Sequence, residues 1–385
     1  MTDDWCHGGF GLYIHWPFCE AKCPYCDFNS HVSRSVDQRA WRDGYLAELK
    51  RTAAETSGRV LNAVYFGGGT PSLMDPETVS DVITAIKSHW PTANDLEITL
   101  EANPGSVDAG RFAAYRQAGV SRVSMGIQAM NDADLRRLGR IHTTSEALQA
   151  FDIARNAFDR VSFDLIYGRQ DQSLAAWEEE LRTALTLAID HISLYQLTVE
   201  NGTAFGDRYA LGKLRGLPDD DLGADMFERT QEICNAMGMP AYEVSNHARD
   251  GAQSRHNLIY WRYGDYIGIG PGAHGRITIG GQKYATECFS NPQKWLENSL
   301  RGETERNRDA LSQSEQSQEF LMMCLRLKEG VDLNRYAALN GSVLAADRIT
   351  KLGDLGIVEI QGNRLIVLDQ GVIVLNAVLE MLLAD

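Results

Sequence analysis

Three cysteines near the N-terminus have the residue type and the spacing of a metal-cluster site. Cys19, Cys23 and Cys26 occur in the run Cys-Glu-Ala-Lys-Cys-Pro-Tyr-Cys, a C-x3-C-x2-C pattern. Iron–sulfur clusters prefer thiolate ligands, and one short loop can bring three thiolates to a cubane 4Fe–4S cluster. Three cysteines on four irons leave one iron without a protein ligand. The pattern therefore predicts a cluster whose open iron binds a further molecule.

Zinc is the alternative that this spacing leaves open. His15 or His31 would complete a site of three cysteines and one histidine. Zinc-binding cysteines usually come as two C-x2-C pairs, and the chain has no second pair of that kind. The spacing therefore favours the iron–sulfur cluster. The other cysteines stand singly, and we expect each to be a small buried side chain: Cys6, Cys234, Cys288 and Cys324.

A glycine-rich segment follows a run of residues that is typical of a β-strand. Residues 62–66 read Asn-Ala-Val-Tyr-Phe, and Gly-Gly-Gly-Thr-Pro follows at 67–71. Because glycine has no Cβ, the backbone N–H and C=O groups of such a segment can approach a ligand closely. Three glycines are also compatible with an ordinary turn. Their position after a strand and after the cysteine loop favours a ligand-binding segment.

The cysteine loop and the glycine segment together resemble the radical S-adenosylmethionine (SAM) superfamily. Within it, the chain resembles the oxygen-independent coproporphyrinogen oxidase-like family and, in that family, the HemW-type heme chaperones. The segments that carry this resemblance extend over nearly the whole chain and are 13–19, 23–29, 101–105, 138–142, 194–198 and 256–261. One segment departs from the pattern. The family usually has Leu-Pro after the equivalent of residues 164–168, whereas this chain has Arg169-Gln170, which leaves the form of that turn open.

The resemblance implies that SAM binds the open iron through its amino and carboxylate groups. It places the SAM site at Tyr13, Tyr25, Gly68, Gly69, Thr70, Glu101, Gln128, Arg140 and Asp164. The side-chain types suit these roles, since Glu101 and Asp164 can accept hydrogen bonds and Arg140 can pair with a carboxylate. Taken singly, Arg140 is also compatible with a surface charge and Asp164 with a helix cap. Their shared position after expected strands favours the site.

A second motif concerns heme. Residues 256–261 read His-Asn-Leu-Ile-Tyr-Trp, in which His256 and Tyr260 are able to bind heme iron and Trp261 to stack on a porphyrin. By residue type alone, a turn that completes the wall of the domain is the favoured interpretation. The resemblance reverses this, because the motif is associated with the heme-binding members of the family. His274 is a competing iron ligand.

Composition narrows the classes of function. Of 385 residues, 44% are hydrophobic and 23% charged, as in an ordinary globular protein, and the length suggests two domains. The net charge of −15 disfavours non-specific binding to nucleic acid. No run approaches the 18 apolar residues of a membrane span, and the first residues, Met-Thr-Asp-Asp, lack the features of a secretory signal. Seven cysteines, three of them clustered, fit a reducing cytoplasm.

Short strands and longer helices are expected to alternate and to position these residues. The strands are expected at 12–15, 63–66, 97–101, 122–127, 160–166 and 191–197, with a further candidate at 242–247, and the helices at 38–54, 77–89, 109–118, 145–155 and 174–187. This alternation predicts right-handed crossovers and a parallel sheet. It fits a doubly wound sheet as well as a barrel, and the resemblance implies an α/β fold with a partial (β/α)6 radical SAM barrel. The carboxyl ends of its strands would bring Gly68, Glu101, Gln128 and Asp164 to one mouth.

We expect three parts along the chain. Residues 1–250 form the partial barrel, and residues 251–302 form a Gly- and aromatic-rich extension whose HNxxYW motif closes it. The charged residues 303–310 form a linker. Residues 311–385 form a small C-terminal winged-helix-like domain of helices and a hairpin, whose Gly362-Asn363 pair tolerates positive φ.

Two classes of function follow from the resemblance. The first is a heme chaperone, which binds heme as cargo, carries a 4Fe–4S cluster with SAM, uses an electron donor and passes the heme to an acceptor protein. The second is an oxygen-independent coproporphyrinogen III oxidase, a radical SAM enzyme of porphyrin metabolism. In the oxidases of the family the cysteine motif reads C-x3-C-x2-C-x-C, and a longer N-terminal arm precedes it. This chain has Phe28 at the position of the fourth cysteine, and 18 residues precede Cys19. Both differences favour the carrier over the enzyme; methyltransferases and heme-degrading enzymes are a third alternative.

Overall fold

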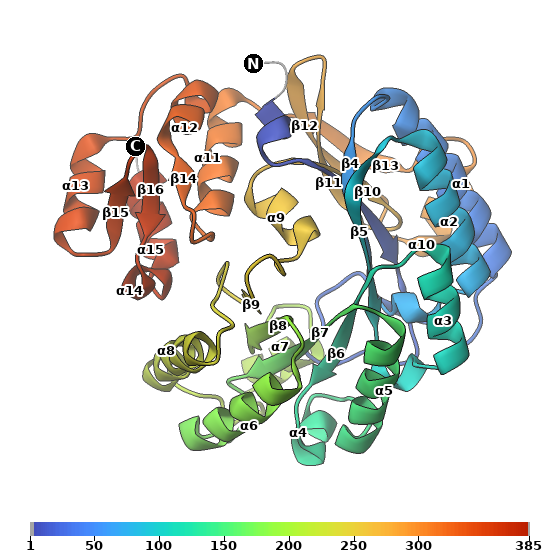
Figure 1. Ribbon diagram of the computed structural model, residues 1–385, viewed down its shortest axis with the longest axis horizontal. Helices are drawn as coiled ribbons and strands as arrows, with labels where there is room; N and C mark the ends of the chain where they lie inside the picture. The colour runs from blue at the N-terminus through green and yellow to red at the C-terminus, as the bar shows by residue number, and fades with distance from the viewer. Residues whose placement is uncertain (1–3, 384–385) are drawn as a thin grey trace.

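The computed structural model, which describes residues 4–383, has an 11-stranded sheet at its centre. The strand order is β13-β12-β11-β10-β1-β4-β5-β6-β7-β8-β9. All neighbours from β10 to β8 in this order run parallel, and the pairs at both ends run antiparallel. Helices cover the outer face of the bent, open sheet (Figure 1). The expected α/β fold with a partial radical SAM barrel is confirmed.

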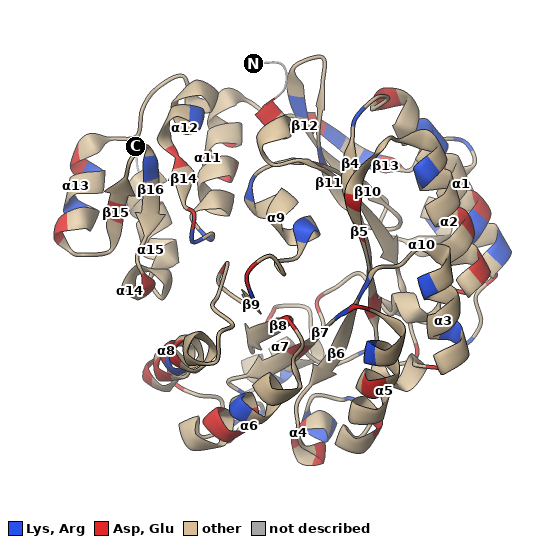
Figure 2. Cartoon of the chain, in the orientation of Figure 1, with Lys and Arg blue, Asp and Glu red and all other residues tan. Residues whose placement is uncertain are grey.

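The parallel core contains the six expected strands and the helices between them. Its strands are β1 (Phe10–Trp16), β4 (Leu61–Gly68), β5 (Thr92–Ala102), β6 (Arg122–Gln128), β7 (Arg160–Tyr167) and β8 (His191–Gln196). Its α-helices are α1 (Gln38–Glu55), α2 (Pro76–His89), α3 (Ala109–Ala118), α4 (Asp132–Arg137), α5 (Thr144–Ala157), α6 (Leu174–Leu187), α7 (Ala204–Ala210) and α8 (Asp220–Ala236). The short 3-10 helices are η1 (Asp4–His7), η2 (Pro71–Leu73) and η3 (Pro104–Ser106). Charged residues of both signs are distributed along the outer helices (Figure 2).

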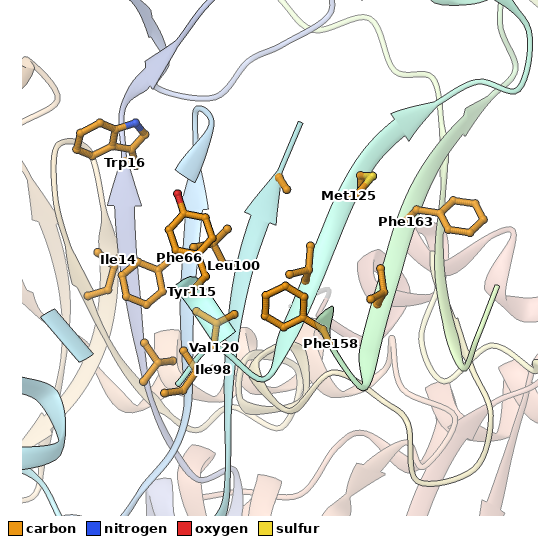
Figure 3. Close-up of a cluster of buried hydrophobic side chains, with 14 of the residues drawn as sticks. Ile14, Trp16, Phe66, Ile98, Leu100, Tyr115, Val120, Met125, Phe158 and Phe163 are labelled. Carbon is orange, nitrogen blue, oxygen red and sulfur yellow. The ribbon is translucent and has the colours of Figure 1, made fainter. Parts of the chain in front are cut away.

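The hydrophobic core lies between the sheet and these outer helices. Successive side chains of a strand point to opposite faces, so each core strand sends its apolar residues outward in alternation. In β7, for example, the ring of Phe163 is fully buried and packs edge-on against Phe151 of α5, with centroids 5.2 Å apart. Figure 3 shows Ile14, Phe66 and other strand residues in this layer. The residues between them face the concave side, where polar groups gather.

Four further strands extend the sheet beyond β1. They are β10 (Asp265–Ile269), β11 (His274–Ile279), β12 (Gln282–Cys288) and β13 (Glu305–Ala310), with α10 (Pro292–Ser299) before the last. The HNxxYW motif forms α9 (Arg255–Trp261), which lies beside β4 and β10. At the opposite edge, β9 (Asn246–Ala248) pairs with β8.

Three local expectations were wrong. The charged segment 303–310 is not a linker, because Glu305–Ala310 pairs with β12; exposed charges are a common protection for such an edge strand. The candidate strand at 242–247 is reduced to β9, since the backbone turns where Tyr242 N donates to Asn246 O. Cys6 is exposed rather than buried because η1 has no buried residue, whereas the other three single cysteines are buried.

The C-terminal part has the expected winged-helix arrangement. Its elements are α11 (Gln313–Cys324), β14 (Val331–Asp332), α12 (Leu333–Asn340), α13 (Ala346–Asp354), β15 (Val358–Gln361), β16 (Arg364–Val367), α14 (Asp369–Val372) and α15 (Leu375–Leu383). Its three strands form a separate sheet in the order β14-β16-β15. The β15–β16 hairpin turns at Gly362, whose φ of 59° lies in the left-handed region. None of the helices between residues 4 and 383 has the length and hydropathy to cross a membrane.

Charged contacts attach this domain to the sheet extension. Glu319 of α11 accepts hydrogen bonds from Arg276 (2.7 Å) and from the hydroxyl of Tyr263 (3.0 Å). Arg335 of α12 pairs with Asp4 at 2.8 Å. These charged groups are largely buried, so each needs its ion-pair partner to offset the cost of desolvation. The pairs therefore hold the domain in one position beside α9 (Figure 1).

We predict that Phe163→Ala lowers the free energy of unfolding by about 3–5 kcal/mol, because it leaves a cavity between β7 and α5. Chemical denaturation followed by far-UV circular dichroism measures the effect. Tyr209→Ala is the control, since Tyr209 is 60% exposed and its loss should cost little. Equal unfolding midpoints for the two variants would contradict the described core.

Candidate functional site

The three motif cysteines lie at and after the end of a very short strand, β2 (Phe18–Cys19). Cys19 ends this strand, and Cys23 and Cys26 lie in the loop that leads to β3 (His31–Val32). Their side chains line a cavity of about 140 Å³. Each sulfur has a polar neighbour: Thr70 Oγ1 lies 3.4 Å from Cys19 Sγ, Arg140 Nη1 3.3 Å from Cys23 Sγ, and Ser30 Oγ 3.7 Å from Cys26 Sγ. The loop thus directs three thiols toward one space.

The electrostatics of the loop suit a positively charged metal centre. Burial raises the pKa of Cys19 and of Cys26 above the ordinary value for a thiol, despite hydrogen bonds from Thr70 and Ser30 that lower it. Thiolates at these positions therefore need a cationic partner. A bound iron–sulfur cluster supplies one.

The geometry does not favour the zinc alternative. Both ring nitrogens of His15 are engaged, with Nδ1 2.9 Å from Tyr13 Oη and Nε2 2.9 Å from the carbonyl oxygen of Asn29. His31 is exposed and lies 3.1 Å from Asn29 Oδ1. Within residues 4–383, no three His, Cys, Asp or Glu side chains converge as ligands of a single ion. A cubane needs no such convergence, because each cysteine binds a different iron. The donor set fits the cluster.

The glycine segment after β4 forms the adjacent wall of this cavity. Gly68 has a φ of +112°, and a Cβ there would lie 2.5 Å from the ring of His15. A Cβ on Gly69 would lie 2.7 Å from the carbonyl oxygen of Phe18. Both positions therefore require glycine. The segment is fixed to the sheet because the Gly68 backbone N–H donates to Glu101 Oε2 at 3.1 Å.

Two half-buried carboxylates lie toward the carboxyl ends of β5 and β7, the strands on either side of β6. Glu101 of β5 accepts a hydrogen bond from Tyr65 Oη at 2.8 Å, and Asp164 of β7 accepts one from Ser124 Oγ at 3.3 Å. Burial raises the pKa of Glu101 to about 7 and that of Asp164 to about 6, and these hydrogen bonds offset only part of the shift. Buried carboxylates with raised pKa values are poised to pair with a positively charged ligand.

Gln128 and Arg140 present buried polar atoms without hydrogen-bond partners. Gln128 ends β6 where the pairing of β6 with β7 is irregular. Its backbone φ of 75° is rare for a residue other than glycine. Its Oε1 and the Nε of Arg140 lack partners, while Arg140 Nη2 donates to the Gly126 carbonyl oxygen at 2.8 Å. Unpaired buried groups are costly, so both atoms indicate contact with a ligand. Tyr25 and Cys23 outweigh burial and keep the pKa of Arg140 above its ordinary value.

The structure brings together all but one of the residues predicted for SAM. The following line the same cavity as the cysteines: Tyr25, Gly68, Gly69, Thr70, Glu101, Gln128, Arg140 and Asp164. Tyr13 does not line it, and its ring stacks on Tyr65 with centroids 6.3 Å apart. Sequence reasoning missed Tyr65, which holds Glu101. The alternation of side chains along the strand before the glycines places Tyr65 on the inner face of the sheet, and this pattern could have indicated its role.

The HNxxYW motif lies behind this wall. His256 is 2% exposed, with Nε2 2.6 Å from Tyr260 Oη and its ring stacked on Tyr65 at 4.8 Å. Burial lowers the pKa of His256 to about 3, so the ring is neutral. Trp261 packs under the guanidinium of Arg326, 4.5 Å from its ring centroid. Of this motif, only Asn257 lines a described cavity, and the competing ligand His274 is exposed on β11.

A second, larger cavity of about 520 Å³ adjoins the first on the concave side of the sheet. The two share lining residues, among them Cys26, Phe28 and Gln128. The larger cavity is lined mainly by inward residues of β5, β6, β7 and β8. A molecule in it would therefore lie next to a ligand held by the cysteine loop.

The departure at Arg169-Gln170 builds a buried ion-pair cluster away from both cavities. Arg169 is 3% exposed; it pairs with Glu180 and, at 2.9 Å, with Asp134. It also donates to the Ile166 carbonyl oxygen at 2.6 Å. These contacts fix the turn after β7, and Arg169 and Gln170 line neither of the two cavities.

Comparison with known proteins finds relatives over nearly the whole chain. The model of the "Radical SAM superfamily" matches residues 13–184. The chain is 38% identical over 381 residues to the heme chaperone HemW of Escherichia coli (strain K12), which covers 97% of this chain and 98% of that protein. It is 37% identical over 385 residues to the mitochondrial radical S-adenosyl methionine domain-containing protein 1 of Bos taurus, covering 97% and 87%.

A solved structure shows the same fold at lower identity. Coproporphyrinogen III oxidase (HemN) from Escherichia coli superimposes with a TM-score of 0.80 and 20% sequence identity, covering 98% of this chain and 90% of that chain. At this identity the comparison establishes the fold alone. It agrees with the open, mainly parallel sheet.

We predict that replacing Cys19, Cys23 or Cys26 by Ala abolishes cluster assembly, because the remaining two thiols cannot hold the cubane. Iron content and visible absorbance after anaerobic reconstitution measure this. Cys234→Ala and Cys288→Ala are matched controls, since both thiols are buried away from the loop. A full iron complement in the triple alanine variant would show that the cluster lies elsewhere.

Proposed function

The chain belongs to the HemW family within the radical SAM superfamily, and on this premise we propose that it is a heme chaperone, which binds heme and passes it to an acceptor protein. The observation that carries the proposal is a sequence identity of 35–38% over 97% of the chain to proteins named heme chaperone HemW. Position 28 supports the proposal, because this chain has Phe28 where the motif of the oxidases has its fourth cysteine.

The cysteine loop would hold a 4Fe–4S cluster, and the groups around it would bind SAM. With SAM on its open iron, such a cluster supplies one-electron chemistry, and the protein supplies orientation and electrostatics. Glu101 and Asp164 would accept hydrogen bonds from positively charged or hydroxyl groups, and Arg140 would pair with a carboxylate. Gly68 and Gly69 would let the backbone approach the ligand. An electron donor would have to reach the loop from the solvent side.

Heme would enter the larger cavity beside the cysteine loop. Its volume of about 520 Å³ lies within the usual range of small-molecule sites, roughly 300–1,000 Å³. The exposed ring of Phe28 lies at the boundary of both cavities and offers apolar surface to a porphyrin. His256 and Tyr260 remain our candidates for iron ligation. Neither lines the cavity, so their mutual hydrogen bond would have to open and the ligating ring would have to move past Tyr65 to reach the iron. We place the protein in the cytoplasm, a reducing compartment suited to free thiols.

We predict that Glu101→Gln weakens SAM binding at least about tenfold while the cluster still assembles, because a cationic ligand loses its buried partner. In the unaltered protein, affinity should fall as pH decreases through the pKa values of about 7 for Glu101 and about 6 for Asp164, since only ionised carboxylates attract the ligand's positive charge. Equilibrium dialysis of reconstituted protein with labelled SAM measures both effects. Asp152→Asn, an exposed change on α5, is the control. Unchanged affinity in Glu101→Gln and in Asp164→Asn would refute the placement.

We predict saturable heme binding and no multiple turnover of coproporphyrinogen III. Reconstituted protein is incubated anaerobically with SAM, a reductant and coproporphyrinogen III, while heme is titrated in parallel and its Soret band followed. Repeated conversion to protoporphyrinogen IX would establish the oxidase instead. Loss of the heme spectrum in a folded His256→Ala variant would support the HNxxYW motif, and an unaltered spectrum would exclude His256 as the ligand.

A further inference from the structure

The floor of the larger cavity is built by inward-facing residues in register on neighbouring strands. Glu101, Ser124 and Ser162 form one row across β5, β6 and β7. His191 continues this row on β8, since Phe163 pairs with Ile192 one residue later. Thr99 and Arg122 pair directly across β5 and β6 in the row below, one step further from the strand ends.

Two of these residues carry a buried polar atom without a hydrogen-bond partner. They are Thr99 Oγ1 and His191 Nδ1, on side chains that are 1% and 3% exposed. Both residues line the cavity of about 520 Å³, as does Arg122, which is 2% exposed. Because an unsatisfied buried donor or acceptor costs about 1–3 kcal/mol, two beside a guanidinium in one cavity mark the position of a ligand.

A hydrogen-bond chain around His191 allows its Nδ1 to donate. The amide Nδ2 of Asn257 donates to Tyr242 Oη at 3.3 Å, and Tyr242 Oη lies 3.1 Å from His191 Nε2. In the tautomer whose Nε2 accepts the phenol proton, the proton of the neutral imidazole is on Nδ1. Burial lowers the pKa of His191 well below its ordinary value, which keeps the ring neutral.

Thr99 and His191 therefore offer two donors beside one guanidinium. Arg122 Nε is paired with Glu97 Oε2 at 3.0 Å and Nη2 donates to the Ala252 carbonyl oxygen at 2.8 Å, which leaves other N–H groups of Arg122 for a ligand. Donors that converge beside a guanidinium favour an anionic acceptor. A carboxylate fits better than a phosphate, because a second negative charge would face Glu97 and Glu101 on the same strand.

We propose that Thr99, Arg122 and His191 form a carboxylate-binding floor, which anchors a propionate of the porphyrin that enters the barrel. The assignment of the carboxylate to heme rests on the proposed function. The opposite edge of the porphyrin would then point toward the cysteine loop, where Cys26 and Phe28 line the same cavity. The floor fixes orientation, because it holds one acidic edge of an otherwise apolar ring.

The test compares heme with its dimethyl ester, in which both propionates are neutral. Each is titrated by its Soret band into the reconstituted full chain with SAM present. We expect the ester to bind at least about tenfold more weakly, as for the loss of a hydrogen bond to a charged group. Thr99→Val and His191→Leu should weaken heme toward the affinity of the ester and leave the ester unchanged, a coupling that a merely structural role would not produce.

His247→Leu is the matched control, because His247 is a fully buried histidine on β9 that does not line the cavity. Circular dichroism and cluster absorbance check the fold of each variant, and the comparison of heme with ester in the unaltered chain decides the question even if a variant misfolds. Equal affinity for heme and ester would overturn the propionate anchor while heme binding itself stands. Absence of binding by either porphyrin would contradict the proposed function and this inference together.

Discussion

The hydrogen bond from Tyr65 Oη to Glu101 connects the three parts of the site. Glu101 also accepts from the Gly68 backbone, so one carboxylate fixes the glycine segment against β5. The ring of Tyr65 stacks on His256, which couples the same carboxylate to the HNxxYW helix. The cluster-side cavity, the larger cavity and α9 therefore depend on a single tyrosine. Its loss would leave a buried carboxylate with half its support, which is costly.

The concave face of the sheet is expensive to build without ligands. The outer face of each strand is covered by helices and packs apolar side chains densely, as Phe163 does. The inner face instead carries carboxylates with raised pKa values and donors without partners, such as Asp164 and Thr99. Such groups destabilise the folded protein when no ligand is bound. Binding of ligands with complementary charge offsets this unfavourable free energy. The arrangement is that of a protein organised around what it holds.

Much of the site could be predicted from the sequence because it depends on local pattern. The cysteine spacing is contiguous, and Glu101 and Asp164 end apolar strands, where a parallel sheet brings side chains together. Contacts between distant segments were not predictable. Alternation shows that His191 faces inward, but it does not show that its Nε2 lies 3.1 Å from Tyr242 Oη.

Edges and exposed turns were the least predictable parts for the same reason. Residues 303–310 resemble a linker in composition, because an edge strand needs charged side chains as much as a linker does. Arg169 looked like a departure at a pocket rim, and only the fold shows that Glu180 and Asp134 neutralise it elsewhere. The exposure of Cys6 follows from a terminal 3-10 turn that no periodic pattern announces.

The most direct test of a carrier is the fate of the bound heme. Reconstituted protein is loaded with one equivalent of heme, given SAM and a reductant without oxygen, and mixed with apomyoglobin as a heme acceptor. The Soret band reports transfer, and mass spectrometry of the extracted tetrapyrrole reports its chemistry. The account predicts that intact heme appears in the acceptor. Recovery of a methylated or ring-opened tetrapyrrole, or heme that never leaves the protein, would contradict it.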